Sequence, residues 1–160
     1  MKIVLSGLSE QSVVDGDGLR FTIFTQGCPH HCEGCHNPST WSFDGGTEYD
    51  TDEIVRKIQE NPLLDGVTFS GGEPFMQIDA LVYIAQKVHN LGLNVWSYSG
   101  YTIEQILKDK KKKRLLENID YLVDGPFVLK LRDLSLRFRG SSNQRIINVK
   151  SYLSKGKVYE

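Results

Sequence analysis

The segment that decides the fold is residues 66–124, which read GVTFSGGEPFMQIDALVYIAQKVHNLGLNVWSYSGYTIEQILKDKKKKRLLENIDYLVD. Three stretches rich in β-branched or aromatic residues are predicted strands, at residues 67–70, 93–98 and 119–123. Residues 77–91 carry apolar side chains at helical spacing and predict a helix that Gly92 ends. Thr102 is the predicted N-cap of a second helix. Strands that alternate with helices favour a parallel sheet with right-handed crossovers.

Further elements are predicted on both sides of this segment. Additional strands are predicted at residues 2–6, 19–26 and 146–149. Asp50, with Glu53 as its box partner, is expected to begin a helix that ends before Pro62, whereas residues 37–49 are predicted to form a loop. With only five or six strands, we expect an α/β fold whose mostly parallel strands form a curved, open, partial (β/α) barrel. A complete eight-unit barrel typically needs about 250 residues.

Length and composition predict a single domain over residues 1–160. The formal net charge of −1 predicts no general attraction to nucleic acid or to an anionic membrane surface. No apolar run approaches the ~18 residues typical of a membrane span, and no charged-then-apolar leader begins the sequence. Because the few cysteines are expected to be free thiols, we expect a reducing, cytoplasmic location.

All three cysteines lie in one stretch, Gly27-Cys28-Pro29-His30-His31-Cys32-Glu33-Gly34-Cys35-His36, with C-x3-C-x2-C spacing. Three thiolates so close together can bind one iron–sulfur cluster. A four-iron cluster takes four ligands, so three cysteines would leave one iron open to another molecule. The stretch directly follows the strand at residues 19–26, which places it at the strand end where active sites of parallel α/β sheets lie.

Other uses of these cysteines remain open from spacing alone. Zinc also binds clustered cysteines, and His30, His31 or His36 could supply a fourth ligand in a non-enzymatic interaction module. Structural zinc usually takes its ligands as two spaced pairs, and the sequence has no second pair. An odd number of cysteines disfavours a disulfide framework, while reactive or inert thiols remain a further alternative.

A second candidate motif, Gly71-Gly72-Glu73-Pro74, immediately follows the predicted strand at residues 67–70. Two glycines allow a ligand to approach the backbone closely. The Glu73 carboxylate could accept charge-assisted hydrogen bonds from an ammonium group. The alternative is a tight turn before a helix.

The C-x3-C-x2-C motif resembles that of the radical S-adenosylmethionine enzymes. Three neighbouring stretches are similar to the activating enzymes of glycyl-radical enzymes: residues 15–20 (DGDGLR), 26–28 (QGC) and 35–41 (CHNPSTW). Three later stretches resemble the activating proteins of anaerobic ribonucleoside-triphosphate reductase: residues 96–102 (WSYSGYT), 123–127 (VDGPF) and 139–145 (RGSSNQR). The resemblance extends over roughly residues 1–150.

This resemblance implies a [4Fe–4S] cluster and S-adenosylmethionine as cofactors. The implied metal ligands are Cys28, Cys32 and Cys35. The residues implied to hold the amino group of S-adenosylmethionine are Gly71, Gly72 and Glu73. Those implied to present backbone to its adenine are Gly34, Cys35 and His36. No side chain is assigned as catalytic. The cluster loop is expected to cover residues 27–46, and a C-terminal extension about residues 126–160.

The implied activity is the reductive cleavage of S-adenosylmethionine to methionine and a 5′-deoxyadenosyl radical, in which the cofactors perform the bond-breaking. That radical would take hydrogen from a glycine of anaerobic ribonucleoside-triphosphate reductase, the implied protein partner. The electron would come from a donor such as flavodoxin or a similar reductant. An alternative target is another glycyl-radical enzyme, such as a formate lyase.

Several polar or aromatic residues near strand ends have two possible roles. Ser97 and Tyr98 could touch the cofactor, although aromatic residues there more often complete a core. Asp124 could reach the cofactor's ribose or the partner, or could cap a turn. Arg20 could face the cofactor carboxylate or form a pair on a sheet surface, and Trp41 is expected to pack within its loop.

Overall fold

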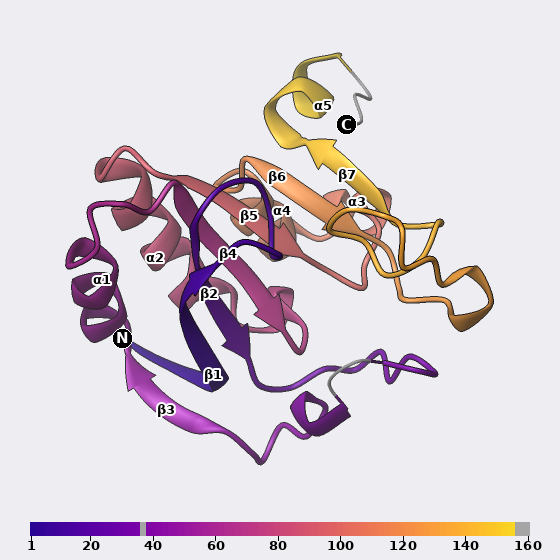
Figure 1. The fold of residues 1–160 in the computed structure, drawn as a ribbon, viewed down its shortest axis with the longest axis horizontal. Coiled ribbons are helices and arrows are strands. Elements are labelled where there is room, and N and C mark those ends of the chain that lie inside the picture. The colour runs from indigo at the N-terminus through magenta and orange to yellow at the C-terminus, as the bar shows by residue number, and fades with distance from the viewer. Residues whose placement is uncertain (36–37, 156–160) are drawn as a thin grey trace.

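A seven-stranded sheet forms the centre of the computed structural model, which describes residues 1–35 and 38–155. The strand order is β3-β1-β2-β4-β5-β6-β7, so β3 and β7 are the two edges of an open sheet (Figure 1). The strands are β1 (Lys2–Ser12), β2 (Arg20–Thr25), β3 (Thr47–Asp50), β4 (Gly66–Gly71), β5 (Asn94–Tyr98), β6 (Tyr121–Asp124) and β7 (Arg145–Asn148).

The centre of the sheet is parallel and its edges are antiparallel. Strands β2, β4, β5 and β6 run parallel, with Phe21 opposite Val67 and Val67 opposite Val95. Strand β1 pairs antiparallel with β2 and β3, and β7 pairs antiparallel with β6. The predicted α/β class with an open, mostly parallel sheet is confirmed. The prediction that residues 37–49 form only a loop is wrong, because residues 47–50 pair with residues 2–5 and add an edge strand.

Five α-helices connect or follow the strands in the described residues. They are α1 (Thr51–Gln59), α2 (Ile78–Asn90), α3 (Ile103–Leu107), α4 (Lys110–Leu116) and α5 (Val149–Lys155). Asp50 begins α1 as predicted, and its side chain accepts from the backbone N–H of Asp52. Thr102 caps α3, and its backbone N–H donates to Gln105 Oε1, which completes a capping box. The caps satisfy N–H groups that have no partner within the helices.

Successive residues of each central strand face opposite sides of the sheet. On one side, Val67 and Phe69 are fully buried with the apolar residues of helices α1–α4, which cover that side (Figure 1). The other side carries a smaller apolar group around Trp96, whose ring meets Phe138 edge to face at 5.3 Å. Phe138 belongs to the long connection between β6 and β7. Helices therefore close one side of the sheet, and connecting segments cover part of the other.

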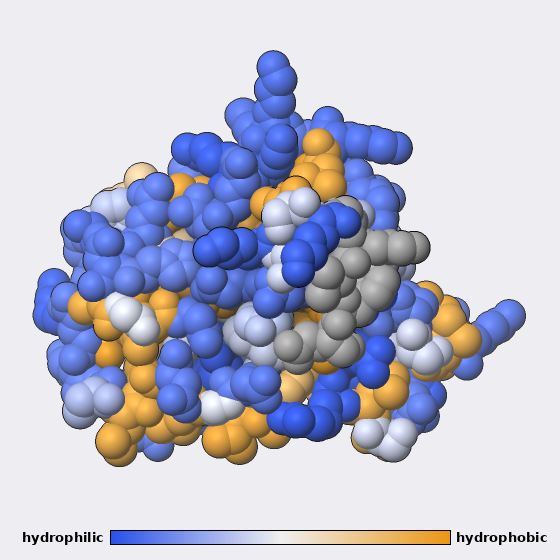
Figure 2. Space-filling view, turned by 90° about the horizontal axis from the view of Figure 1, so that it is seen from above, coloured by the Kyte–Doolittle hydropathy of each residue, from blue (hydrophilic) through white to orange (hydrophobic). Residues whose placement is uncertain are grey.

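Polar and charged residues dominate the face shown in Figure 2, where apolar residues form separate patches. Across residues 1–35 and 38–155, no helix has both the length and the apolar character needed to cross a membrane.

Candidate cofactor site

A cavity of about 380 Å³ lies where the connections that follow the parallel strands meet. This volume is within the range of small-molecule pockets, about 300–1,000 Å³. The cysteine stretch, the glycine pair and the end of β5 contribute Cys28, Cys32, Cys35, Gly71, Gly72 and Gly100 to its walls. The structure therefore brings the two predicted motifs together in one place, as expected for residues at the carboxyl ends of parallel strands.

Backbone hydrogen bonds close the segment that carries the cysteines. Gly27 N donates to Thr40 O at 2.7 Å, and Cys28 N donates to Trp41 O at 3.1 Å. All three cysteines are outside disulfides and of intermediate burial. Burial raises the pKa of Cys28 and of Cys32 above the ordinary value of a thiol. A bound cation reverses this tendency, because metal ligation requires and stabilises the thiolate.

Gly71 and Gly72 stand where no side chain can be accommodated. Gly71 has a φ of +90°, and a Cβ there would lie 2.4 Å from Thr25 N. A Cβ on Gly72 would lie 2.4 Å from the carbonyl oxygen of Gly27. Gly72 N donates to Thr25 O at 2.7 Å, so this wall of the cavity is bonded directly to the end of β2. The glycine pair is therefore required by close packing of two backbones.

The Glu73 carboxylate lies behind this wall and is completely buried, with 0% of the residue exposed. Its Oε1 lies 2.7 Å from His30 Nε2 and accepts from Gly100 N at 2.7 Å. Its Oε2 accepts from Ser99 Oγ at 2.9 Å and from Phe75 N at 3.0 Å. A carboxylate has about four acceptor positions, and these four partners account for them. Glu73 can therefore act on the cavity through its charge rather than through an oxygen that is open to a ligand.

Two buried donors on the cavity wall have no acceptor within the described part of the chain. They are Trp41 Nε1 and Arg139 Nε. Buried polar groups are normally hydrogen-bonded, so unpaired donors in a cavity indicate a ligand that supplies acceptors. The unpaired donors, the three thiols and the glycine wall together fit an iron–sulfur cluster with a polar organic ligand beside it.

Some predicted site residues lie away from this wall or outside the residues that the structure describes. Gly34 has a φ of +75°, and a Cβ there would lie 2.7 Å from the side chain of Leu129, outside the cavity. Cys35 lines the cavity. His36 lies outside the described residues. The assignment of Gly34, Cys35 and His36 to an adenine stays a prediction.

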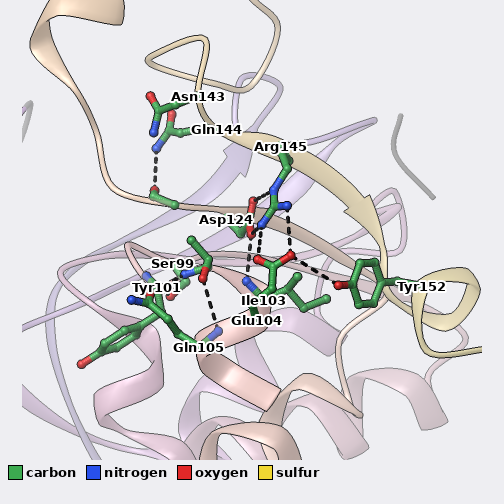
Figure 3. A network of polar contacts seen from close by, with 12 residues as sticks. Ser99, Tyr101, Ile103, Glu104, Gln105, Asp124, Asn143, Gln144, Arg145 and Tyr152 are labelled. Carbon is green, nitrogen blue, oxygen red and sulfur yellow. Dashed lines mark hydrogen bonds and ion pairs between the residues drawn. The ribbon is translucent and has the colours of Figure 1, made fainter. Parts of the chain in front are cut away.

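Asp124 is fully buried and belongs to a network of polar contacts that also includes Glu104 and Arg145 (Figure 3). Its carboxylate accepts from Ile103 N at 2.8 Å and from Arg145 Nε at 2.9 Å. Arg145 also donates to Glu104 at 2.6 Å. The hydrogen bonds that Arg145 donates to Asp124 and Glu104 raise the pKa of Arg145 above its already high ordinary value. These contacts match the second role predicted for Asp124, that of a capping residue, because the carboxylate joins α3 to the edge strand β7.

Arg20 and Tyr98 occupy the loop-covered side of the sheet. Arg20 is fully buried and donates to Thr68 Oγ1 at 2.7 Å and to Asn94 Oδ1 at 2.7 Å, so its contacts match the predicted pairing on the surface of the sheet. Burial lowers the pKa of Arg20 to about 10. Tyr98 lines the cavity, and burial raises the pKa of its phenol well above the ordinary value. Ser97 is buried, with its hydroxyl bonded to the Tyr98 carbonyl.

Sequence reasoning missed three contributors to the site. The sequence predicts His30 only as a zinc ligand, and it predicts no role for Arg139 or Gly100. Gly100 did carry a signal, since it is a glycine just after a predicted strand, like the Gly71-Gly72 pair. The contact of His30 with Glu73 carries no local signal, because the two residues are 43 positions apart in sequence.

A family model for a 4Fe-4S single cluster domain matches residues 14–147. The anaerobic ribonucleoside-triphosphate reductase-activating protein of Vibrio cholerae is 37% identical over 142 residues, covering 84% of this chain and 90% of that protein. The protein of the same name from Haemophilus influenzae is 34% identical with the same coverage. This chain belongs to the family of anaerobic ribonucleoside-triphosphate reductase-activating proteins. The predicted resemblance is confirmed.

Two further comparisons place this family member among its neighbours. The pyruvate formate-lyase-activating enzyme of Clostridium pasteurianum is 36% identical over 115 residues, which are 65% of this chain and 48% of that enzyme. The crystal structure of QueE from Escherichia coli has a TM-score of 0.50 at 16% identity, covering 64% of this chain and 54% of that one. The structural likeness supports the fold. The iron–sulfur domain favours the cluster over the zinc alternative.

Proposed function

We propose that this family member activates anaerobic ribonucleoside-triphosphate reductase by reductive cleavage of S-adenosylmethionine at a [4Fe–4S] cluster. The observation that carries the proposal is the convergence of three cysteine thiols and a glycine wall on one cavity. When bound, the cofactors use one electron from an external donor to yield methionine and a 5′-deoxyadenosyl radical, which takes a hydrogen atom from a partner glycine. The alternative of a non-enzymatic module does not account for the cavity.

The residues of this chain would bind, orient and shield these cofactors. Cys28, Cys32 and Cys35 would supply the three thiolates. The backbone of Gly71 and Gly72 would receive the ammonium group of S-adenosylmethionine, and the buried negative charge of Glu73 behind them would favour that cation. We extend the proposal to the backbone of Gly34, Cys35 and His36 as the adenine contact.

Unpaired donors and apolar side chains complete the cavity. Trp41 Nε1 and Arg139 Nε are available to acceptor oxygens of the ligand. Phe127 and Phe138 also line the cavity and limit the access of water to the reacting atoms. In a reaction of this kind the protein contributes binding, orientation and the exclusion of side reactions.

The reductase is the favoured target because the matched activating proteins of that name share about nine-tenths of their length with this chain. A formate lyase is the second candidate, supported by the similarity to the Clostridium pasteurianum enzyme. We further propose a cytoplasmic location and an electron donor such as flavodoxin. Free cysteines are typical of a reducing compartment.

The test is anaerobic reconstitution with iron and sulfide, followed by reduction and addition of S-adenosylmethionine. We expect 5′-deoxyadenosine and methionine as products, measured by chromatography. With purified anaerobic reductase present, we expect a glycyl-radical signal by electron paramagnetic resonance (EPR), and none with a formate lyase. A fully loaded cluster that gives neither product nor radical would refute the proposal.

A further inference from the structure

The side chain of His30 connects the cysteine-bearing segment to the buried Glu73. His30 lies between Cys28 and Cys32 in the sequence, and its Nε2 is 2.7 Å from Glu73 Oε1. The His30 side chain is 17% exposed and that of Glu73 is fully buried. Hydrogen bonds to an ionised carboxylate are among the stronger ones in proteins, because one partner carries a charge.

The imidazole ring is held on two further sides. Tyr101 meets it edge to face, with ring centroids 4.5 Å apart. Gly100 adjoins it so closely that a Cβ there would lie 2.4 Å from His30 Cδ2. Because Gly100 has no side chain, the His30 ring can occupy this position. Packing as well as hydrogen bonding therefore orients the ring toward Glu73.

The same carboxylate joins the connections that follow three neighbouring strands. Glu73 itself follows β4, it accepts from Ser99 and Gly100 after β5, and its backbone N–H donates to Gly27 O after β2 at 2.8 Å. His30 is the side chain that reaches this junction from between the cysteines. Together with these backbone bonds, the His30–Glu73 contact therefore helps to fix the position of the thiols relative to the glycine wall.

We propose that His30 is a positioning residue for S-adenosylmethionine binding, acting through Glu73. By anchoring the cysteine segment against the Gly71-Gly72 wall, it sets the spacing between the cluster and the methionine end of the cofactor. This inference rests on the proposed function. Removing a partner that orients metal-ligating residues typically lowers metal affinity or activity by about 10- to 100-fold, and we take the same order of magnitude for a ligand that binds beside the metal. We expect a loss of S-adenosylmethionine affinity in that range, with the iron content unchanged because the three cysteines remain.

Two substitutions separate hydrogen bonding from packing. His30→Phe keeps a ring against Tyr101 but cannot bond to Glu73. His30→Gln loses the ring but places an amide nitrogen as many bonds from Cβ as Nε2 of histidine, so it can donate to Oε1. His89→Gln is the control, since His89 Nε2 lies 2.8 Å from Asp120 in a more exposed histidine–carboxylate pair outside the cavity.

Each reconstituted protein is assayed for iron and sulfide content, for the dissociation constant of S-adenosylmethionine, and for the EPR spectrum of the reduced cluster with and without that cofactor. We expect His30→Phe to bind iron normally, to bind the cofactor about 10- to 100-fold more weakly, and to show little spectral change at a concentration that saturates the wild type. His30→Gln and His89→Gln should resemble the wild type.

Wild-type affinity and spectral change in His30→Phe would overturn the inference. So would a His30→Gln variant that binds as weakly as His30→Phe, or variants that lose iron in proportion to affinity. The wild type measured in parallel distinguishes the two claims. A wild-type protein that binds no S-adenosylmethionine would refute the proposed function, whereas equal binding in the wild type and His30→Phe would refute the role of His30 alone.

Discussion

Replacing Glu73 by glutamine is expected to destabilise the protein strongly, although the side chain keeps its size. The carboxylate receives four contacts, from His30, Phe75, Ser99 and Gly100. A glutamine side chain offers one acceptor oxygen, so two of the four donors would lose their partner in a fully buried place. Hydrogen bonds to charged groups contribute about 1.5–3 kcal/mol each, which gives a loss of about 3–6 kcal/mol. Typical domains have a total stability of only about 5–15 kcal/mol.

Thermal unfolding of the cluster-free protein, followed by circular dichroism under reducing conditions, measures this loss. For a chain of this size, about 2–4 °C of unfolding temperature corresponds to 1 kcal/mol, so we expect a decrease of about 6–24 °C. Glu10→Gln is the control, because Glu10 is exposed on β1 and such substitutions usually change stability by less than about 0.5 kcal/mol. A Glu73→Gln protein that unfolds at the wild-type temperature would contradict the claim that the Glu73 carboxylate holds these connections together.

Three further outcomes are expected. Substituting any one cluster cysteine by serine should remove the brown colour and most of the bound iron, and a variant that keeps full iron would contradict the three-thiolate site. Gly71→Ala should lower stability in urea by more than Gly92→Ala, because both glycines have positive φ but only at Gly71 would a Cβ meet neighbouring backbone; equal losses would disprove the close packing. Arg145 lowers the pKa of Glu104, so the wild type should unfold at a higher temperature than Glu104→Gln at pH 7. This difference in unfolding temperature should vanish as the pH falls through the lowered pKa of Glu104, and a difference that persists at pH 2 would refute this.

The sequence was sufficient for the central strands and for bringing the two motifs together. Residues 66–124 carry clear strand and helix periodicities, and parallel topology then requires their connections to meet at one edge of the sheet. The cysteine stretch and the glycine pair each follow a strand, so their convergence did not need side-chain detail.

Other features depend on pairing between distant segments. Strand β3 is short and becomes a strand only by pairing with β1, which nothing within residues 47–50 indicates. The side-chain contacts within the site also join segments that are distant in sequence. Glu73 and His30 are 43 positions apart, and whether the carboxylate faces a ligand or a histidine is decided by three loops at once. Local pattern identifies the residue types that can do the chemistry, whereas tertiary packing decides which of them touch the ligand.

The most direct test of the central claim is the Mössbauer spectrum of protein reconstituted with ⁵⁷Fe, recorded with and without S-adenosylmethionine. A cluster held by three cysteines predicts that one iron of the four differs from the rest and that its signal alone shifts when the cofactor is added. Four equivalent irons that do not respond to the cofactor, or a protein that takes up zinc in place of a cluster, would contradict the account.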